Sequence, residues 1–237
     1  MALRIDLYSR CWNDAHMLGF FFRHYDLLVQ RYIVFDDGAT DGSLEILGAH
    51  PKVEIRSLPH TDPDSRVLSA STLFDNCWKQ SRGAADWVIL TDIDEYLCHP
   101  DIDSYLRGCH ARGVTIVPAL GYQILSETFS PPDVHLSRTI TLEAPCPQMS
   151  KLNIFDPSEV ETTHIMSPGG MSPPWRVTSS FPTGTSFFSS ITSTWTSSAG
   201  RRGMSDAEHD SGRKTGPASG AVSICGLGKI FSEIGRA

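Results

Sequence analysis

Acidic residues gather just after an apolar run near the middle of the chain. Asp92, Asp94 and Glu95 follow residues 87–91, which predict a buried strand, and ligands of open α/β sheets bind where such strands end. Residues two apart in an extended segment point the same way, so Asp92 and Asp94 are expected to face one target. Carboxylate oxygens suit Mg²⁺ or Mn²⁺, and either cation can also bind a diphosphate. The residues alone leave open a second interpretation, a polar strand end with capping acids.

A second acidic cluster follows the apolar run at residues 31–35. Asp36, Asp37 and Asp41 lie there in a stretch rich in turn-forming residues. Because parallel strands end at one edge of a sheet, this loop is expected near the loop that holds Asp92. A carboxylate at this place can accept hydrogen bonds from a nucleobase N–H or a ribose hydroxyl. An ordinary Asp-Gly turn is the alternative.

The elements that must position these residues alternate along the front part of the chain. Short β-rich runs followed by amphipathic stretches predict an α/β layer fold, with a mostly parallel sheet and helices on both faces. Asn13 or Asp14 is expected to cap the first helix, although either residue could also touch a nucleotide. Trp12, Trp78 and Trp87 are expected in the core. We expect strands at residues 4–8, 31–35, 53–57, 87–91 and 114–119, and helices at 15–25, 43–49, 67–81 and 101–113.

The composition argues against several classes of protein. The 237 residues carry a formal net charge of -7, so there is no sequence-wide cationic field to hold nucleic acid. Six cysteines without a C-x-x-C pair argue against a structural zinc site and indicate reduced thiols. No run approaches the roughly 20 apolar residues of a membrane span, and the first residues lack a signal-peptide pattern. We therefore expect a cytoplasmic protein.

Two different kinds of sequence are joined near residue 164. Residues 1–164 hold 13 basic and 23 acidic residues, whereas residues 165–237 hold 7 and 4, together with 15 Ser, 7 Thr and 11 Gly. The second part shows no sustained helical or strand period. We therefore expect one folded domain at 1–164 and a low-complexity tail, irregular or disordered, at 165–237.

Several fragments of the front part share their order and spacing with a known family. They are the loop at residues 34–43, the D-x-D at 92–94, and residues 6–14, 22–25, 118–122 and 149–152. Together they resemble the family 2 glycosyltransferases of the GT-A fold, over roughly residues 3–164. In that family the loop contacts the nucleotide, and the D-x-D holds a metal and the donor diphosphate. The resemblance implies a Rossmann-like GT-A domain that transfers a sugar from a nucleotide-diphosphate sugar.

Individual residues are candidates for the roles that such an enzyme needs. Asp36, Asp37 and Asp92 are expected at the donor, and Asp92 and Asp94 at Mg²⁺ or Mn²⁺. Lys151 is expected to pair with the donor diphosphate as a point charge, although a solvated lysine fits the sequence equally well. Glu127 is a candidate general base that would deprotonate the hydroxyl of a glycan or other acceptor in an inverting transfer.

The C-terminal part departs from that family. Members end in an apolar segment with a Leu-Leu-His-Tyr-Lys-Tyr-Leu-like sequence, whose His the resemblance implies at the metal or diphosphate site, and this chain lacks the segment. The codons permitted for residues 186–195 can encode such a segment in another reading frame. This favours a frameshift after about Ile165 and an impaired enzyme.

Two other functions fit the acidic motif. A Mg²⁺-dependent phosphohydrolase also places D-x-D after a buried strand, but the enzymes that resemble the haloacid dehalogenase group usually have Thr or Val where Tyr96 stands. The other alternative is a non-catalytic remnant that binds a nucleotide sugar without transferring it.

Overall fold

The computed structural model describes residues 2–124, 130–136, 143–147, 150–161 and 222–226, and their strands form one sheet. The order of its nine strands is β3-β2-β1-β4-β8-β6-β9-β5, with β7 paired to β6. The strands are β1 (Ile5–Cys11), β2 (Arg31–Asp36), β3 (Val53–Ser57), β4 (Trp87–Leu90), β5 (Glu95–Cys98), β6 (Ile116–Ile124), β7 (Glu143–Pro145), β8 (Lys151–Phe155) and β9 (Val222–Gly226). The helices are α1 (Ala15–Tyr25), α2 (Ser43–Gly48), α3 (Arg66–Phe74), the 3₁₀ turn η1 (Cys77–Ser81) and α4 (Ile102–Ala111).

The sheet has a parallel half and a mixed half. β1 lies between β2 and β4 and pairs with both in parallel, and β3 extends this half beyond β2. β8 then runs antiparallel to both β4 and β6. The predicted α/β class is confirmed, and four of the five expected strands form the parallel half.

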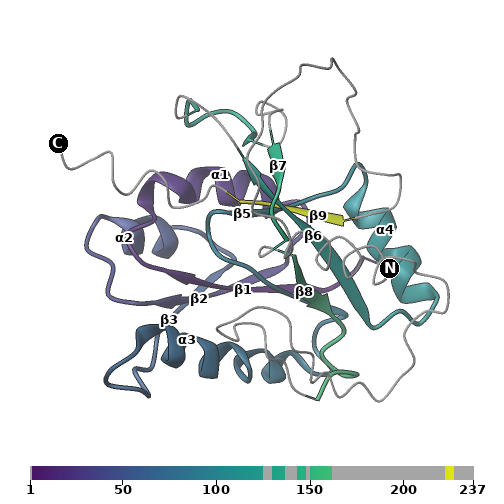
Figure 1. Ribbon diagram of the computed structural model, residues 1–237, viewed down its shortest axis with the longest axis horizontal. Coiled ribbons are helices and arrows are strands. Elements are labelled where there is room, and N and C mark those ends of the chain that lie inside the picture. The colour runs from purple at the N-terminus through teal and green to yellow at the C-terminus, as the bar shows by residue number, and fades with distance from the viewer. Residues whose placement is uncertain (1, 125–129, 137–142, 148–149, 162–221, 227–237) are drawn as a thin grey trace, which may run out of the picture.

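Helices cover both faces of the sheet (Figure 1). Successive side chains of a strand point to opposite faces, and β4 shows this directly. Trp87 and Ile89 belong to the core cluster that includes residues of α1, α2 and α4. Val88 and Leu90 belong to the cluster that includes α3 and η1. All four side chains are buried, as the uninterrupted apolar run predicted for a central strand.

The helix expected at residues 67–81 is instead two elements. α3 ends at Phe74, and the separate turn η1 begins at Cys77. Asp75 and Asn76 stand between them, and both are poor helix formers because their side chains compete for backbone hydrogen bonds. Asn76 leaves the helical region with φ at -133°. The break turns the chain so that Trp78 is completely buried.

One part of the expected irregular tail is a strand. β9 lies between β6 and β5 (Figure 1), parallel to the first and antiparallel to the second. In this arrangement Ile224 is opposite both Gly121 and Leu97. The other positions of 165–237 lie outside the described residues, so the domain boundary and the frameshift stay predictions.

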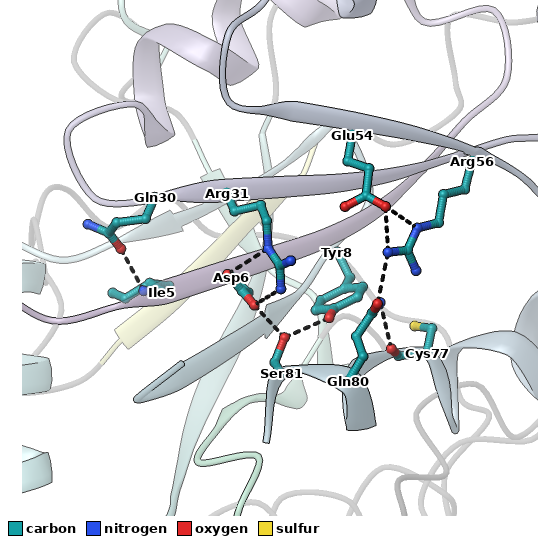
Figure 2. Close-up of polar contacts among 10 residues, drawn as sticks. All are labelled: Ile5, Asp6, Tyr8, Gln30, Arg31, Glu54, Arg56, Cys77, Gln80 and Ser81. Carbon is teal, nitrogen blue, oxygen red and sulfur yellow. Dashed lines mark hydrogen bonds and ion pairs between the residues drawn. The ribbon is translucent and has the colours of Figure 1, made fainter. Parts of the chain in front are cut away.

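A buried polar network joins β1 to β2 and η1 (Figure 2). The Asp6 carboxylate accepts hydrogen bonds from Arg31, at 3.2 Å from Nε and 2.5 Å from Nη2, and from the Ser81 hydroxyl. The Tyr8 hydroxyl lies 2.6 Å from Ser81 Oγ. Tyr8 and Ser81 are completely buried, so the network satisfies polar groups that water cannot reach.

The structure bears on two features considered from composition, the state of the cysteines and the length of apolar helices. The five described cysteines, Cys11, Cys77, Cys98, Cys109 and Cys146, are free thiols. Among the residues that the structure describes, no helix is both long enough and apolar enough to cross a bilayer.

Candidate functional site

The loops that follow β1, β2 and β4 lie at one edge of the sheet. Cys11 is opposite Asp36 in the β1–β2 pair, and Tyr8 is opposite Leu90 in the β1–β4 pair. The loops continue this contact, because Asp37 N donates to Cys11 O at 2.9 Å and Thr91 N donates to Tyr8 O at 3.1 Å. Both acidic clusters therefore lie beside the end of β1, on opposite sides of it.

The loops after β1 and β2 are tied together by side chains. Asn13 Oδ1 accepts from Thr40 N at 2.7 Å, and Ser43 Oγ accepts from Asp14 N at 3.0 Å. Asn13 has a left-handed backbone with φ at 58°, a conformation that Asn tolerates better than most residues. The side chains of this loop are therefore fixed by the neighbouring loop.

The expected cap of α1 comes from the other loop. Asp14 occupies the N-cap position without a capping side-chain hydrogen bond, and its Oδ2 accepts instead from Trp12 N at 2.9 Å. The first N–H of the helix, on Ala15, donates to Asp41 Oδ2 at 2.9 Å. The expectation that the side chain of Asn13 or Asp14 caps α1 is therefore wrong, because the Asp41 carboxylate accepts the hydrogen bond from the first helical N–H instead.

We expect Asp41→Ala to lower the free energy of unfolding by about 1–2 kcal/mol, as for the loss of an N-cap. Besides Ala15, the Asp41 carboxylate accepts from Ser43 N at 3.1 Å and Ser43 Oγ at 2.5 Å, so both helix starts lose a partner. Urea titration followed by circular dichroism measures the change. The nearby exposed Glu45 is the control, and Glu45→Ala should cost less than half as much. Equal losses would contradict a capping role for Asp41.

Asp36 and Asp37 are both engaged within their own surroundings. Asp36 Oδ1 accepts from Gly38 N at 3.1 Å and Ala39 N at 2.8 Å, which is the Asx arrangement of an ordinary turn. The buried Asp37 carboxylate lies 3.3 Å from Arg66 Nη1. The alternative of an Asp-Gly turn thus describes Asp36, and contact of either residue with a nucleoside stays a prediction.

The segment after β4 is a turn rather than an extended strand. Glu95 N donates to Asp92 O at 3.1 Å. This hydrogen bond closes a turn at residues 92–95, which we call the acidic turn, and its last residue, Glu95, is the first residue of β5. The expectation that Asp92 and Asp94 face one target by strand alternation is therefore wrong in its reason. The three carboxylates of this turn nevertheless lie close enough to interact, since the charges of Asp92 and Glu95 both raise the pKa of Asp94.

Two cations pair with the acidic turn. Arg10 Nε lies 3.2 Å from Asp92 Oδ1, and Lys151 Nζ lies 2.5 Å from Glu95 Oε1. Burial lowers the pKa of Lys151, but the charges of Glu95, Asp92 and Asp94 outweigh it, and the net direction is upward. Lys151 is therefore charged and bound to Glu95, and its expected pairing with a diphosphate stays a prediction.

Two carboxyls of the turn, Asp94 and Glu95, have a pKa that burial raises. Burial, followed by the charges of Asp92, Glu95 and Asp14, raises the pKa of Asp94 from 3.8 to about 7. Burial also raises the pKa of Asp14. The Tyr96 hydroxyl is buried next to this group and has no hydrogen-bond partner among the described residues. A negative charge on Asp94 is thus costly unless something positive comes close to it.

The protein side chains alone do not make a complete metal site. Within the described residues, no group of three or more His, Cys, Asp or Glu side chains is arranged to hold a metal ion. Mg²⁺, however, is usually held by one or two carboxylates together with substrate phosphates and water. The acidic turn fits this second kind of site, in which Asp92 and Asp94 would supply only part of the shell.

Comparison with known families assigns the chain. The model of glycosyltransferase family 92 matches residues 13–194. The chain belongs to glycosyltransferase family 92. The resemblance seen in the sequence is confirmed for a glycosyltransferase but not for family 2, which is a different family. The match also runs past residue 164, where the composition predicts the end of the domain.

Solved structures similar to this family 92 chain are distant. TarS 1–349 of S. aureus in complex with UDP is 13% identical, with a TM-score of 0.40, and the match covers 66% of this chain and 47% of that one. Glucosyl-3-phosphoglycerate synthase from Mycobacterium tuberculosis, solved with Mn²⁺, UDP and glucosyl-3-phosphoglycerate, is 20% identical with a TM-score of 0.32, covering 51% and 44%. This chain thus spans less than half the length of these proteins. No curated protein matches it.

Sequence reasoning misses or misplaces several residues of this candidate site. Trp12, expected in the core, is instead 58% exposed just after the end of β1. Arg10 is not among the expected site residues, although its place at the end of β1, next to β4, is a usable signal. Glu127 lies outside the described residues, so its role as general base stays a prediction.

Proposed function

We propose that this family 92 chain transfers a sugar from a nucleotide-diphosphate sugar to an acceptor hydroxyl. The donor diphosphate would lie at the carboxyl edge of β1, β2 and β4, beside Asp92 and Asp94. The family match supports the class of reaction. The meeting of three loops at one edge supports the place, since ligands of α/β sheets bind there.

The observation that carries the proposal is the environment of Asp94. Its carboxyl is largely withdrawn from water beside three other carboxylates, and its pKa is raised to about 7. The nearby cations Arg10 and Lys151 pair with Asp92 and Glu95 instead. A bound cation would stabilise the ionised form of Asp94. A diphosphate also needs a cation in order to bind near carboxylates, because its own charge is negative.

We infer that Asp92 and Asp94 would hold a divalent cation, Mg²⁺ or Mn²⁺. When bound, the cation would neutralise the charge that develops on the departing nucleoside diphosphate. The chain's own residues would fix the geometry. Arg10 orients Asp92, and Lys151 holds the Glu95 carboxyl at the start of β5, where its charge partly offsets the rise in the pKa of Glu95 that burial causes. The loop at Asp36 and Asp37 would hold the nucleoside, and Glu127 would act as base on the acceptor.

A screen of nucleotide sugars tests the proposal. We expect one donor to raise the melting temperature of the wild-type chain with Mn²⁺ and to have little effect with EDTA. At 100 times Kd the added stability is about 2.7 kcal/mol. Incubation of that donor with glycan acceptors should then release the nucleoside diphosphate. If no nucleotide sugar stabilises the protein in the presence of Mn²⁺, the proposal is wrong.

The same assay separates the alternatives. Release of inorganic phosphate from a phosphomonoester, without response to any nucleotide sugar, would favour the phosphohydrolase. Stabilisation by a nucleotide sugar with no transfer and no hydrolysis would select the non-catalytic remnant. The family match favours the transferase over the phosphohydrolase.

A further inference from the structure

β5 continues directly from the acidic turn and is held along both of its edges. On one edge it pairs with β9, through the register of Tyr96 with Cys225 and Cys98 with Ser223. On the other, the backbone groups of Glu95 and Leu97 contact side chains of α1. β5 is thus held by α1, which begins shortly after the carboxyl end of β1 and ends beside β5 (Figure 1).

The helix contacts are made by two consecutive residues. The Tyr25 hydroxyl donates to Glu95 O at 3.1 Å and accepts from Leu97 N at 2.9 Å. His24 Nε2 lies 2.9 Å from Leu97 O. One buried hydroxyl therefore satisfies both a carbonyl and an amide of β5, in the place where a neighbouring strand would otherwise supply them.

Tyr25 is suited to this role by its surroundings. The side chain is completely buried, and its ring packs edge-on against Phe21 at 5.1 Å between centroids. Burial raises the pKa of the hydroxyl well above 10, so the proton that it donates to Glu95 O is always present. The ring cannot move without disturbing the α1 core, and the position of the hydroxyl is therefore fixed.

The position of Glu95 in turn fixes the acidic turn. Its N–H closes the turn on Asp92 O at 3.1 Å. Its carboxylate accepts from Thr91 Oγ1 at 3.3 Å and pairs with Lys151. A shift of Glu95 would therefore move Asp92 and Asp94 together, since only the two residues Ile93 and Asp94 lie between the hydrogen-bonded ends of the turn.

We propose that Tyr25 is a positioning residue, whose hydroxyl, shared between Glu95 and Leu97, sets the geometry of the acidic turn and thereby its affinity for a divalent cation with a diphosphate. This inference rests on the proposed function. Tyr25 itself touches neither the cation nor the donor. It acts on them through β5.

The test compares Tyr25→Phe with Tyr32→Phe. Tyr32 is also completely buried, and its hydroxyl donates to Asp26 at 3.0 Å, away from β5. Both variants lose one buried hydroxyl and should melt a few degrees below wild type. Calorimetry with Mn²⁺ and UDP should show a loss of affinity of roughly 10-fold to 100-fold in Tyr25→Phe only, as for partners that orient metal ligands. Hydrogen exchange of residues 92–98 without metal should also rise only in Tyr25→Phe.

The outcomes are distinct. Equal affinity and equal exchange in Tyr25→Phe and wild type would overturn the positioning role while leaving the donor site in place. Equal losses in both variants would also overturn it, because they would reflect stability alone. A wild-type chain that binds no Mn²⁺ with any of several nucleoside diphosphates would overturn the proposed function and this inference with it. If Tyr25→Phe does not fold, amide exchange of the wild-type chain is the second measurement: the Leu97 N–H, which donates to the Tyr25 hydroxyl, should be protected, and rapid exchange of that amide would overturn the role.

Discussion

Replacing Asp94 by asparagine is expected to stabilise the cation-free protein and to abolish cation-dependent donor binding. Asp94 is largely withdrawn from water beside Asp92, Glu95 and Asp14, and its pKa of about 7 shows that its negative charge is unfavourable in the folded state. A neutral side chain of the same shape removes that cost, which is on the order of 4 kcal/mol at pH 8. The same change removes a proposed ligand of the cation.

The measurements are urea unfolding at pH 8 and calorimetry with Mn²⁺ and a nucleoside diphosphate. Asp103→Asn is the matched control, since Asp103 is an exposed carboxylate that pairs with Arg107 one turn along α4. That control should change stability by less than about 0.5 kcal/mol and leave binding intact. Unchanged donor affinity in Asp94→Asn would remove the main support for the site.

The pH dependence of stability provides a second readout of Asp94. Its pKa is about 7 in the folded chain and near 3.8 when unfolded, so between these values the folded state binds more protons. The contribution of this group to stability is therefore fully present below about pH 4 and falls as the pH rises toward 7. The decline should be smaller in Asp94→Asn, where Asp14 and Glu95 still have a raised pKa, and saturating Mn²⁺ should reduce the decline in the wild type.

Replacing Asp6 by alanine is expected to cost about 2–4 kcal/mol of unfolding free energy, the second large effect. The carboxylate is buried and accepts from Arg31 and Ser81 (Figure 2), so its loss leaves buried donors without their acceptor. The exposed part of Arg31 can turn toward water, which keeps the cost below that of a fully buried ion pair.

Denaturant titration measures this loss, and Glu54→Ala is the comparison. Glu54 pairs with Arg56 at 2.6 Å on the exposed strand β3, where an ion pair contributes less than about 1 kcal/mol. Asp6 is opposite Arg31 at the start of β2, so the network lies away from the carboxyl ends of β1, β2 and β4, where the donor is proposed to bind. Donor affinity should therefore be unchanged in Asp6→Ala. A cost below about 1 kcal/mol would show that Asp6 is not the centre of the network.

The parallel half of the sheet follows from simple sequence patterns. β2 and β4 each contain an uninterrupted apolar stretch, whereas Asp6, Ser9 and Arg10 interrupt the apolar residues of β1, and hydrophobic burial on both faces allows few other arrangements. The pattern of these runs therefore suffices to place the acidic residues after β2 and β4 at one edge. It does not predict the direction of each carboxylate, because Asp36 is directed by hydrogen bonds within its own loop and Asp37 by Arg66.

The remaining elements depend on contacts distant in sequence. β5 and β8 are short and begin with the charged residues Glu95 and Lys151, so neither shows a clear strand pattern. The ion pair that joins the starts of these two strands is a tertiary effect. The exposure of Trp12, just after the end of β1, is likewise not predictable from residue type, since aromatic character alone predicts burial.

The place of β9 also bears on how the protein is made. This strand joins β5 to β6, yet it is translated long after both of them. While the ribosome is still adding residues between β8 and β9, α1 can already contact one edge of β5. The other edge of β5 stays unpaired until β9 has been translated. The parallel half of the sheet can therefore fold before β9 is made, whereas β5 gains its second neighbouring strand only afterwards.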